Sequence, residues 1–440
     1  MSTEAPVLEI RPLQSPPAVT ISVPGSKSLS NRALLVAALG IGRCTLTGVL
    51  FSDDTRYMAQ ALRDLGIAVT ASEEGEQFEV QGTGGRLPAS EADLFIGNSG
   101  TTARFLTSYV GLGHGRYRID GVQRMRERPI QPLLDALAGL GVRAYSEANT
   151  GCPPVIVEAA GIRGGETRLS GSISSQYLSS LLMVGPYMEQ GLEVEIEGEL
   201  VSRPYIDLTI GLMQDFGVQV EQDGPSRFRI AAGQRYTARQ YAVEPDASNA
   251  SYFFAAAAVT GGRVRVEHLS ARSQQGDIHF ADVLEQMGCT VLWEDGAVEV
   301  QGPRELRGVS VDMNAISDTA QTLAAIAPFA TSPVRISGIA HVRAKETDRI
   351  SAVVTELQRL GVRVEEYADG MLIYPSSIAP AEVETYDDHR MAMSFAVAGL
   401  VAPGVRIKDP ACVNKTFPRY FEKLSELRGE GAASGLADSV

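Results

Sequence analysis

Cysteine is scarce in this chain: four occur in 440 residues, and no two form a Cys-x-x-Cys pair. We therefore expect reduced thiols in a cytoplasmic protein and no zinc site. The sequence also lacks any run of 18 uncharged apolar residues, so no membrane-spanning helix is predicted. The first residues are neither basic nor markedly apolar, and we expect no signal peptide.

Net positive charge is lacking as well, since the formal charge is −14. This argues against general binding to nucleic acid. Two nucleotide-binding motifs are also missing, namely Gly-x-x-x-x-Gly-Lys-Ser/Thr and a Gly-x-Gly-x-x-Gly that follows a strand. Basic residues that gather locally against this acidic background are therefore informative.

One pattern recurs five times along the chain: an amphipathic helix, a glycine and a short strand. The glycines are Gly66, Gly141, Gly217, Gly288 and Gly361, at intervals of 71 to 76 residues. A glycine in the left-handed conformation can end a helix and turn the chain at once into a strand. The near-constant period predicts duplicated α/β units, and the length of the chain predicts two or three domains.

A sixth unit would need its strand near residue 435, but residues 429–440 are rich in small residues and are expected to form a flexible tail. Our hypothesis is that residues 7–13 supply this strand instead, which would place both termini in one domain. The chain would then cross between domains twice, near Pro24-Gly25 and near Glu244-Pro245-Asp246.

The first of five polar stretches is Pro24 to Arg32, where Ser26 can cap a helix predicted over residues 28–39. Lys27 then lies at the helix N-terminus, and Ser28 and Arg32 share one face. Backbone N–H groups, a positive helix end and two cations suit a phosphate or a carboxylate.

Four further stretches in the first half of the chain have similar features. Residues 98–104 form a small-residue turn before a helix, and residues 124–130 place Arg128 just before another. Residues 172–177 and 202–205 offer hydroxyls and an amide near helix starts. Taken singly, each stretch could equally be an ordinary turn, a solvated charge run or a helix cap.

A further group lies in the second half, where Asp318, Lys345, Arg390 and Lys415 are expected at or beside helix starts, with Lys345 and Arg349 on one helix face. Cations there oppose the helix dipole, so an anion is expected to compensate. Two phosphates and two carboxylates would bring about −5 to −6. Seven cations could balance that charge: Lys27, Arg32, Arg128, Lys345, Arg349, Arg390 and Lys415.

Together, in this order, the stretches resemble the 5-enolpyruvylshikimate-3-phosphate synthase family of enolpyruvyl transferases, over roughly residues 20–427. The most specific motifs are Pro24-Gly25-Ser26-Lys27-Ser28, Asn98-Ser99-Gly100-Thr101, Glu127-Arg128-Pro129-Ile130, Ser174-Ser175-Gln176, Lys345-Glu346-Thr347-Asp348-Arg349, Asp388-His389-Arg390-Met391-Ala392-Met393 and Lys415-Thr416-Phe417-Pro418.

The resemblance implies an α/β (α+β) fold of two domains that close over substrate. Each would be a pseudo-threefold array of α/β units, an inside-out α/β barrel, with residues 1–24 plus 246–440 in one domain and residues 25–245 in the other. It implies transfer of the enolpyruvyl group of phosphoenolpyruvate to the 5-hydroxyl of shikimate 3-phosphate, in chorismate and aromatic amino-acid biosynthesis. The family is the target of glyphosate. No metal, cofactor, membrane or nucleic acid is implied, and we expect a monomer.

The resemblance also assigns residue roles. Asp318 would be the base and Glu346 the acid, and Lys27 would touch both substrates. The residues expected to bind shikimate 3-phosphate are Lys27, Ser28, Arg32, Ser174, Ser175, Gln176, Ser202, Tyr205, Asp318 and Lys345. The residues expected to bind phosphoenolpyruvate are Lys27, Asn98, Gly100, Arg128, Gln176, Arg349, Arg390 and Lys415. His341 departs from the pattern, because many members carry Asn there.

Three alternatives remain. The sibling transferase that acts on UDP-N-acetylglucosamine typically uses a loop cysteine, and residues 111–129 contain none. A non-catalytic binder of phospho-acids could share the fold. A purely structural repeat protein would leave the cations at helix starts unexplained.

Overall fold

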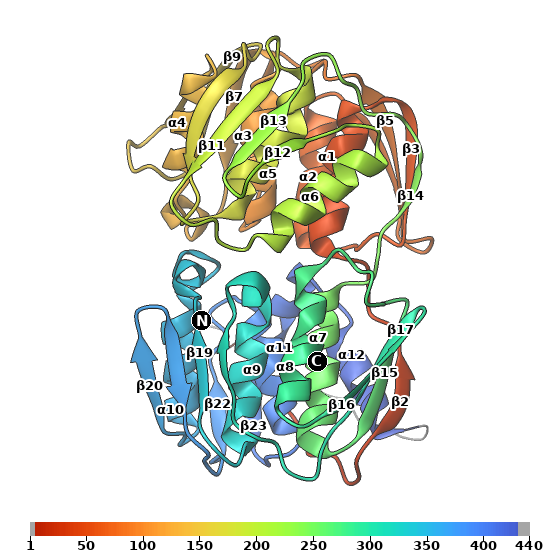
Figure 1. The fold of residues 1–440 in the computed structure, drawn as a ribbon, viewed down its shortest axis with the longest axis vertical. Coiled ribbons are helices and arrows are strands. Elements are labelled where there is room, and N and C mark those ends of the chain that lie inside the picture. Colours follow the sequence, from red (N-terminus) through yellow and green to blue (C-terminus); the bar gives the residue numbers. More distant parts are fainter. Residues whose placement is uncertain (1–4, 430–440) are drawn as a thin grey trace. The chain divides into compact units, whose positions relative to one another are not determined.

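The computed structural model describes residues 5–429, and contacts divide them into two compact units (Figure 1). We call Gly25–Glu244 the inserted unit, and residues 5–24 with 245–429 the terminal unit. Within the inserted unit the N–H of Ser26 donates to the carbonyl of Glu244 at 2.7 Å, and within the terminal unit Asp246 donates likewise to Pro24 at 2.8 Å. Apart from Gly429, the expected flexible tail lies outside the described residues.

The inserted unit runs from red to green in Figure 1. Its helices are α1 (Lys27–Leu39), α2 (Asp53–Asp64), α3 (Gly100–Val110), α4 (Gln131–Gly139), α5 (Ser175–Val184) and α6 (Pro204–Asp215). Its strands are β3 (Ile41–Thr47), β4 (Ala68–Ser72), β5 (Gln77–Thr83), β6 (Glu91–Phe95), β7 (His114–Asp120), β8 (Arg143–Ser146), β9 (Val155–Ala160), β10 (Gly165–Ser170), β11 (Leu192–Glu197), β12 (Glu221–Asp223), β13 (Arg227–Ile230) and β14 (Gln240–Ala242).

The terminal unit repeats this plan. Its helices are α7 (Ala247–Thr260), α8 (Phe280–Gln286), α9 (Ala320–Ile326), α10 (Arg349–Arg359), α11 (His389–Gly399) and α12 (Tyr420–Ser425). Its strands are β1 (Val7–Glu9), β2 (Ala18–Ile21), β15 (Arg263–Glu267), β16 (Thr290–Glu294), β17 (Ala297–Gln301), β18 (Ser310–Asp312), β19 (Val334–Ser337), β20 (Val364–Tyr367), β21 (Gly370–Ile373), β22 (Ala381–Val383) and β23 (Val405–Lys408).

Short 3₁₀ turns connect these elements. They are η1 (Met125–Glu127), η2 (Gly185–Tyr187), η3 (Gly276–His279), η4 (Asn314–Thr319), η5 (Ala327–Phe329), η6 (Ala340–Ala344), η7 (Pro410–Lys415) and η8 (Glu426–Arg428). Several of them hold or adjoin predicted site residues: Asp318 lies in η4, Lys415 ends η7 and Lys345 follows η6.

The four-stranded sheets of the described residues share one topology, in which a parallel pair is extended by an antiparallel hairpin. In the inserted unit the strand orders are β14-β3-β5-β4, β6-β7-β9-β8 and β10-β11-β13-β12. In the terminal unit they are β16-β17-β15-β2 and β18-β19-β21-β20, with a three-stranded sheet β1-β23-β22. The predicted fold class, an α/β protein of repeated units, is confirmed.

The three-stranded sheet shows which segment supplies the strand that the sixth unit lacks. β1 pairs antiparallel with β23, with Val7 opposite Lys408 and Glu9 opposite Arg406. Within the described residues, the strand predicted from residues 7–13 is therefore confirmed over Val7–Glu9, and it comes from the opposite end of the chain.

The five helix-to-strand glycines adopt the predicted left-handed conformation, with φ between 78° at Gly361 and 102° at Gly288. In each case the next residue donates its N–H back to the helix, as Ile67 does to the carbonyl of Leu62 and Val142 to that of Leu137, both at 2.9 Å. This is the Schellman arrangement, which satisfies carbonyls left free at a helix C-terminus.

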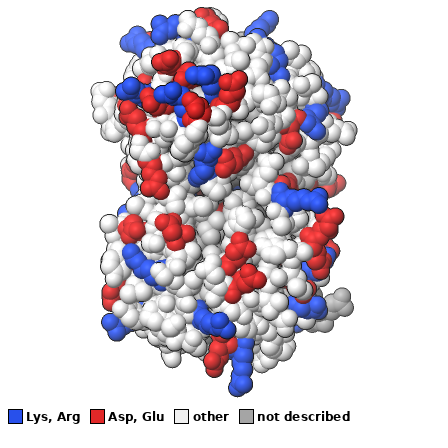
Figure 2. All heavy atoms as spheres, viewed as in Figure 1, with Lys and Arg blue, Asp and Glu red and all other residues white. Residues whose placement is uncertain are grey.

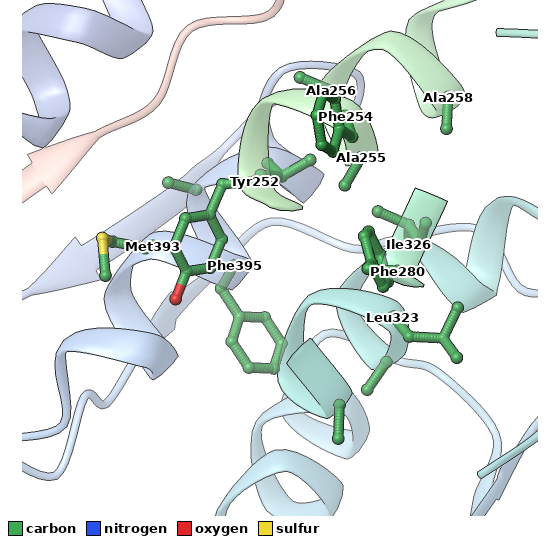
Figure 3. Close-up of a cluster of buried hydrophobic side chains, with 14 of the residues drawn as sticks. Tyr252, Phe254, Ala255, Ala256, Ala258, Phe280, Leu323, Ile326, Met393 and Phe395 are labelled. Carbon is green, nitrogen blue, oxygen red and sulfur yellow. The ribbon is translucent and has the colours of Figure 1, made fainter. Parts of the chain in front are cut away.

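Each unit has its own core around helices that are buried on nearly every side. In the inserted unit every residue of α1 from Leu29 to Leu39 is buried. In the terminal unit Figure 3 shows Tyr252 and Phe254 of α7 in one cluster with Leu323 of α9 and Phe395 of α11. Of these central helices, α1 and α11 carry predicted site residues in their first turns, Lys27 and Arg390.

The surface follows the composition. Figure 2 shows basic and acidic side chains interspersed on the face in view, without a large patch of one sign. Ion pairs such as Arg229–Glu193 at 3.0 Å and Arg168–Glu195 at 3.4 Å join neighbouring strands. Across residues 5–429, every helix is too short or too polar to cross a bilayer.

A close contact between a glycine and a central helix gives a test of this packing. A Cβ atom on Gly302 would lie 2.1 Å from the carbonyl oxygen of Ala257 in α7, which backbone cannot accommodate without a shift. We expect Gly302→Ala to lower the free energy of unfolding by about 1–3 kcal/mol, the usual cost of overpacking. Thermal unfolding measures this. Gly75→Ala is the control, since its Cβ would meet only the Ser72 side chain, at 3.1 Å; equal midpoints for the two variants would contradict the expectation.

Candidate functional site

Lys27 is the first residue of α1, and the hydroxyl of Ser26 caps that helix by accepting from the N–H of Leu29 at 3.4 Å. The Lys27 ammonium lies 3.8 Å from a carboxylate oxygen of Asp54, at the start of α2. Its side chain is 12% exposed. The structure thus keeps this predicted cation at a helix start with access to solvent, beside Ser28, which is half-buried.

Arg32 is buried, and its guanidinium connects three helices. Its Nε donates to the hydroxyl of Thr209 in α6 at 2.7 Å, one Nη donates to Ser179 in α5 at 3.2 Å, and the other donates to the carbonyl of Ser28 at 3.0 Å. Burial lowers the pKa of Arg32 to about 10, so it stays charged near neutral pH. Through these hydrogen bonds Arg32 links α1, α5 and α6 near their N-terminal ends.

Arg128 lies against the turn that precedes α3. Its Nη1 donates to the backbone carbonyl of Asn98 at 2.9 Å and to the Asn98 side-chain oxygen at 3.2 Å. A Cβ atom on Gly100 would lie 2.4 Å from Nη2 of Arg128. A side chain at position 100 would displace this guanidinium.

The carbonyl of Pro129 is a second fixed point for the Arg128 segment. It accepts a hydrogen bond from Arg104 in α3 at 2.7 Å and another from the hydroxyl of Tyr177 in α5 at 2.6 Å. The neighbouring arginines differ: Arg126 binds Asp120 through two nitrogens, and Arg124 pairs with Glu127. For Arg124 and Arg126 the ordinary interpretation, a charge run paired at the surface, is sufficient.

The serine-rich stretches also meet at helix starts. Ser174 caps α5 by accepting from the N–H of Gln176 at 3.2 Å, and the Gln176 amide donates to the hydroxyl of Thr101 in α3 at 3.4 Å. Ser202 is buried and has φ of 53°, and Tyr205 is half-buried in the first turn of α6. The hydrogen bonds of Gln176 and Arg32 bring the first turns of α1, α3, α5 and α6 to one end of the inserted unit.

In the terminal unit the predicted site residues converge on the carboxylate of Asp318. Lys345 donates to Oδ1 at 2.5 Å, Arg349 donates to the same oxygen at 3.2 Å, and Arg390 donates to Oδ2 at 2.8 Å. Asp318 lies in η4, Lys345 follows η6, and the two arginines are in the first turns of α10 and α11. One carboxylate therefore holds three cations from three different segments.

Two further carboxylates complete this cluster. Asp388 is fully buried and binds Arg349 through both oxygens, at 2.7 and 3.1 Å. Glu346 lies between Arg349 at 2.9 Å and Lys415 at 3.2 Å. We call Asp318, Lys345, Glu346, Arg349, Asp388, Arg390 and Lys415 the charged cluster; in it, four cations face three carboxylates.

The pKa values in the charged cluster reflect a balance between burial and pairing. Burial alone would lower the pKa of Arg349, but the charges of Asp388, Glu346 and Asp318 raise it above its ordinary value. Burial lowers the pKa of Lys345, and the partly opposing charge of Asp318 does not restore it. Burying these cations costs free energy, and pairing with the carboxylates offsets that cost.

Two details of the sequence prediction are wrong. Lys345 and Arg349 do not share a helix face, because α10 begins at Arg349 and Lys345 lies in an irregular segment with ψ of −149°. The Asp348 carboxylate caps α10 by accepting from the N–H groups of Ile350 and Ser351. Lys415 ends η7 instead of opening a helix.

His341 is a buried neighbour of the charged cluster. Its Nε2 lies 3.0 Å from the hydroxyl of Ser317, the residue before Asp318. Burial, helped by the charge of Lys345, lowers the pKa of His341 to about 3. The imidazole is therefore neutral at physiological pH, and it braces the segment that carries Asp318. The sequence marks His341 as a departure from the family pattern but predicts no contact for it.

The sequence predicts no role for Asp388, a member of the charged cluster, or for Tyr252 beside it. The contact of Asp388 with Arg349 joins residues 39 apart in the chain. The Tyr252 hydroxyl in α7 accepts from Arg390 at 3.3 Å, and no local sequence pattern predicts this contact. Among the described residues, no group of three or more His, Cys, Asp or Glu side chains could hold a metal ion.

The two sets of residues define a class of protein: an α/β repeat protein that presents fixed cations and hydroxyls at the first turns of its helices, suited to small anionic ligands. Residues 14–424 match the family model described as EPSP synthase (3-phosphoshikimate 1-carboxyvinyltransferase). The chain belongs to this family, as its motifs predicted.

Similar proteins carry the same description. A 3-phosphoshikimate 1-carboxyvinyltransferase from Nostoc punctiforme is 56% identical over 420 residues, which are 96% of this chain and 99% of that protein. A chloroplastic relative from Solanum lycopersicum is 48% identical over 425 residues, covering 92% of this chain and 82% of its own length. EPSP synthase from Acinetobacter baumannii has a solved structure with a TM-score of 0.81 and 26% identity, covering 96% of this chain and 98% of that one.

The pKa of His341 gives a prediction for stability. Because the folded-state pKa is depressed from 6.5 to about 3, the unfolded chain binds a proton in this range that the folded chain does not. The contribution of the neutral imidazole to the free energy of unfolding has its full value above about pH 6.5 and is lost as the pH falls towards 3. Between pH 6 and 4 we expect the wild type to lose up to about 1.4 kcal/mol per pH unit more than His341→Asn. Urea unfolding across this range measures the difference; parallel curves would contradict it.

Proposed function

We propose that this protein transfers the enolpyruvyl group of phosphoenolpyruvate to the 5-hydroxyl of shikimate 3-phosphate and releases phosphate. The family to which the chain belongs supports this, since its relatives are named 3-phosphoshikimate 1-carboxyvinyltransferase. The observation that carries the proposal is the Asp318 carboxylate with three cations, because it combines a base with groups that bind anions. Such an enzyme is a transferase of the shikimate pathway and a target of glyphosate.

Phosphoenolpyruvate carries a phosphate and a carboxylate, and both would bind to cations. In the terminal unit Arg349, Arg390 and Lys415 would bind it. In the inserted unit Lys27, Arg128 and the Asn98–Gly100 turn would bind it, with Gln176 beside them. Support comes from the two arginines that meet on Asp318 and from the lack of a side chain at Gly100, which leaves room for the Arg128 guanidinium.

Shikimate 3-phosphate would bind mainly to polar groups of the inserted unit. Ser174, Ser175 and Ser202 would bind its phosphate near Tyr205, at helix starts whose N–H groups favour an anion. Lys27, Ser28, Arg32 and Gln176 would complete that set. From the terminal unit, Asp318 and Lys345 would reach its hydroxyls.

The proposed chemistry is addition followed by elimination. In the addition Asp318 takes the proton of the 5-hydroxyl, and the hydroxyl oxygen bonds to the vinyl carbon of phosphoenolpyruvate. Glu346 gives a proton to the methylene carbon. In the elimination Glu346 takes a proton back from the methyl group, the double bond re-forms, and phosphate leaves with the proton returned by Asp318. The cations would stabilise the phosphate and carboxylate of the intermediate. Lys345 and Arg349, which already donate to Asp318, would hold that carboxylate in place.

We also propose a monomer in the cytoplasm. Each unit buries its own apolar core, which supports independence from a second copy. The four cysteines all lie in the described part of the chain and are free thiols, as a reducing compartment would require. No metal or organic cofactor is needed for the proposed steps.

The direct test is phosphate release with each acceptor substrate. We expect phosphate from phosphoenolpyruvate with shikimate 3-phosphate and none with UDP-N-acetylglucosamine. Release with the sugar nucleotide would favour the sibling transferase, and release with neither would favour a non-catalytic binder.

The proposed acid and base predict a specific defect. We expect Asp318→Ala and Glu346→Ala each to lower kcat by about 100- to 10,000-fold, the usual contribution of a general acid or base. Steady-state phosphate release measures kcat, and calorimetry with shikimate 3-phosphate checks that the Glu346 variant still binds this substrate. Near wild-type turnover in either variant would remove that residue from the proposed chemistry.

Gly100 predicts how the site treats phosphonate mimics of phosphoenolpyruvate. An added methyl group would push the Arg128 guanidinium from its place, because the atoms would lie 2.4 Å apart. We expect Gly100→Ala to raise the KM for phosphoenolpyruvate and to weaken inhibition by the longer phosphonate more strongly. Inhibition constants measured beside Gly111→Ala, at the other end of α3, give the comparison; equal inhibition of wild type and Gly100→Ala would refute the steric explanation.

A further inference from the structure

A fully buried carboxylate, Glu356, lies in the terminal unit outside the charged cluster. It is in α10, seven residues and so two turns after Arg349. Its Oε2 accepts from the N–H of Glu384 at 3.0 Å, and its Oε1 accepts from the hydroxyl of Tyr386 at 2.7 Å. Arg359 lies 3.4 Å from Oε2. A buried carboxylate is costly unless such partners satisfy it, so its place here needs an explanation.

The segment that Glu356 holds has an unusual backbone. Tyr386 and Asp387 are consecutive residues with φ of 54° and 53°, a left-handed conformation that non-glycine residues adopt only when their surroundings impose it. The other polar contacts join the turn to β23 and to itself: the Thr385 hydroxyl donates to the carbonyl of Lys408 at 3.0 Å, the Lys408 ammonium pairs with Glu384 at 2.7 Å, and Asp388 donates its N–H to Thr385 at 2.9 Å. Glu356 thus supplies two of the bonds that impose this conformation.

The turn leads directly into the charged cluster. Asp388 follows it, caps α11 by accepting from the N–H of Arg390 at 2.9 Å, and binds Arg349 through both oxygens. Helices α10 and α11 are therefore joined at two places, one at Arg349 with Asp388 and one at Glu356 with the turn. Contacts at two places fix both the distance and the angle between the helices, whereas a contact at one place would let the helices rotate about it.

We infer that Glu356 and Tyr386 are positioning residues for phosphoenolpyruvate: by holding the left-handed turn before α11, they set the spacing of Arg349 and Arg390. This inference rests on the proposed function, in which both guanidiniums bind that substrate. Neither Glu356 nor Tyr386 touches the reacting atoms. Burial and the neighbouring Glu356 raise the pKa of Tyr386 to about 12, so its hydroxyl stays a donor at working pH.

The terminal unit offers a matched control. Tyr374 donates to the carboxylate of Glu365 at 2.8 Å, the same kind of hydrogen bond as that between Tyr386 and Glu356. Glu365 is a half-buried residue of β20, and Tyr374 is a half-buried residue that follows β21; neither belongs to the charged cluster. Tyr374→Phe removes an equivalent hydrogen bond without loosening the turn at 384–388.

The experiment compares kcat and both KM values for the wild type, Tyr386→Phe, Glu356→Gln and Tyr374→Phe. We expect Tyr386→Phe to raise the KM for phosphoenolpyruvate about fivefold, the value of one lost hydrogen bond, with the KM for shikimate 3-phosphate unchanged. Glu356→Gln should raise it further, because the amide cannot accept from both donors. Tyr374→Phe should match the wild type.

The outcomes separate this inference from the proposed function. A wild type without turnover on the two substrates overturns both. A wild type that turns over, with an unchanged KM for phosphoenolpyruvate in Tyr386→Phe, overturns the positioning role alone. The positioning role is also overturned if both KM values rise together, or if Tyr374→Phe shows the same change, since either would indicate a general loss of structure.

Discussion

Three cations share the carboxylate of Asp318, and the site in the terminal unit depends on this interaction. Lys345, Arg349 and Arg390 come from separate segments and would repel one another strongly at such distances in a poorly hydrated environment. Asp318 between them, with Asp388 and Glu346 behind, offsets that repulsion before any substrate arrives. Without these carboxylates, the negative charges of the substrate would be needed to offset the repulsion among the cations.

The inserted unit solves a similar problem with fewer charges. Its first helical turns supply N–H groups and hydroxyls, and Arg32 below them is satisfied by neutral oxygens of Thr209, Ser179 and Ser28. Arg128 rests on the Asn98 turn, where only glycine at position 100 leaves room. Neutral donors around a few cations suit a ligand with several hydroxyls, whereas the charged cluster suits a small, highly charged one.

Features with local causes were predictable from the sequence. The left-handed glycines that end helices are confirmed, because the conformation depends on one residue and its neighbours. The first turn of α1 was predictable for the same reason. Lys345 and Lys415 were placed wrongly, since the cap by Asp348 and the turn η7 decide where the helices begin. Asp388 and Glu356 received no role, because their partners lie 39 and about 30 residues away and no spacing rule reports such contacts. The substrate roles of individual residues stay predictions.

The most direct test of the central claim is the affinity of Asp318→Asn for phosphoenolpyruvate, measured by calorimetry with shikimate 3-phosphate at saturation. If the Asp318 carboxylate occupies the cations in place of the substrate, removing its charge should leave binding at least as tight as in the wild type. Binding that is several-fold weaker, in a variant that remains folded, would contradict the claim and would make Asp318 chiefly a scaffold for the cations.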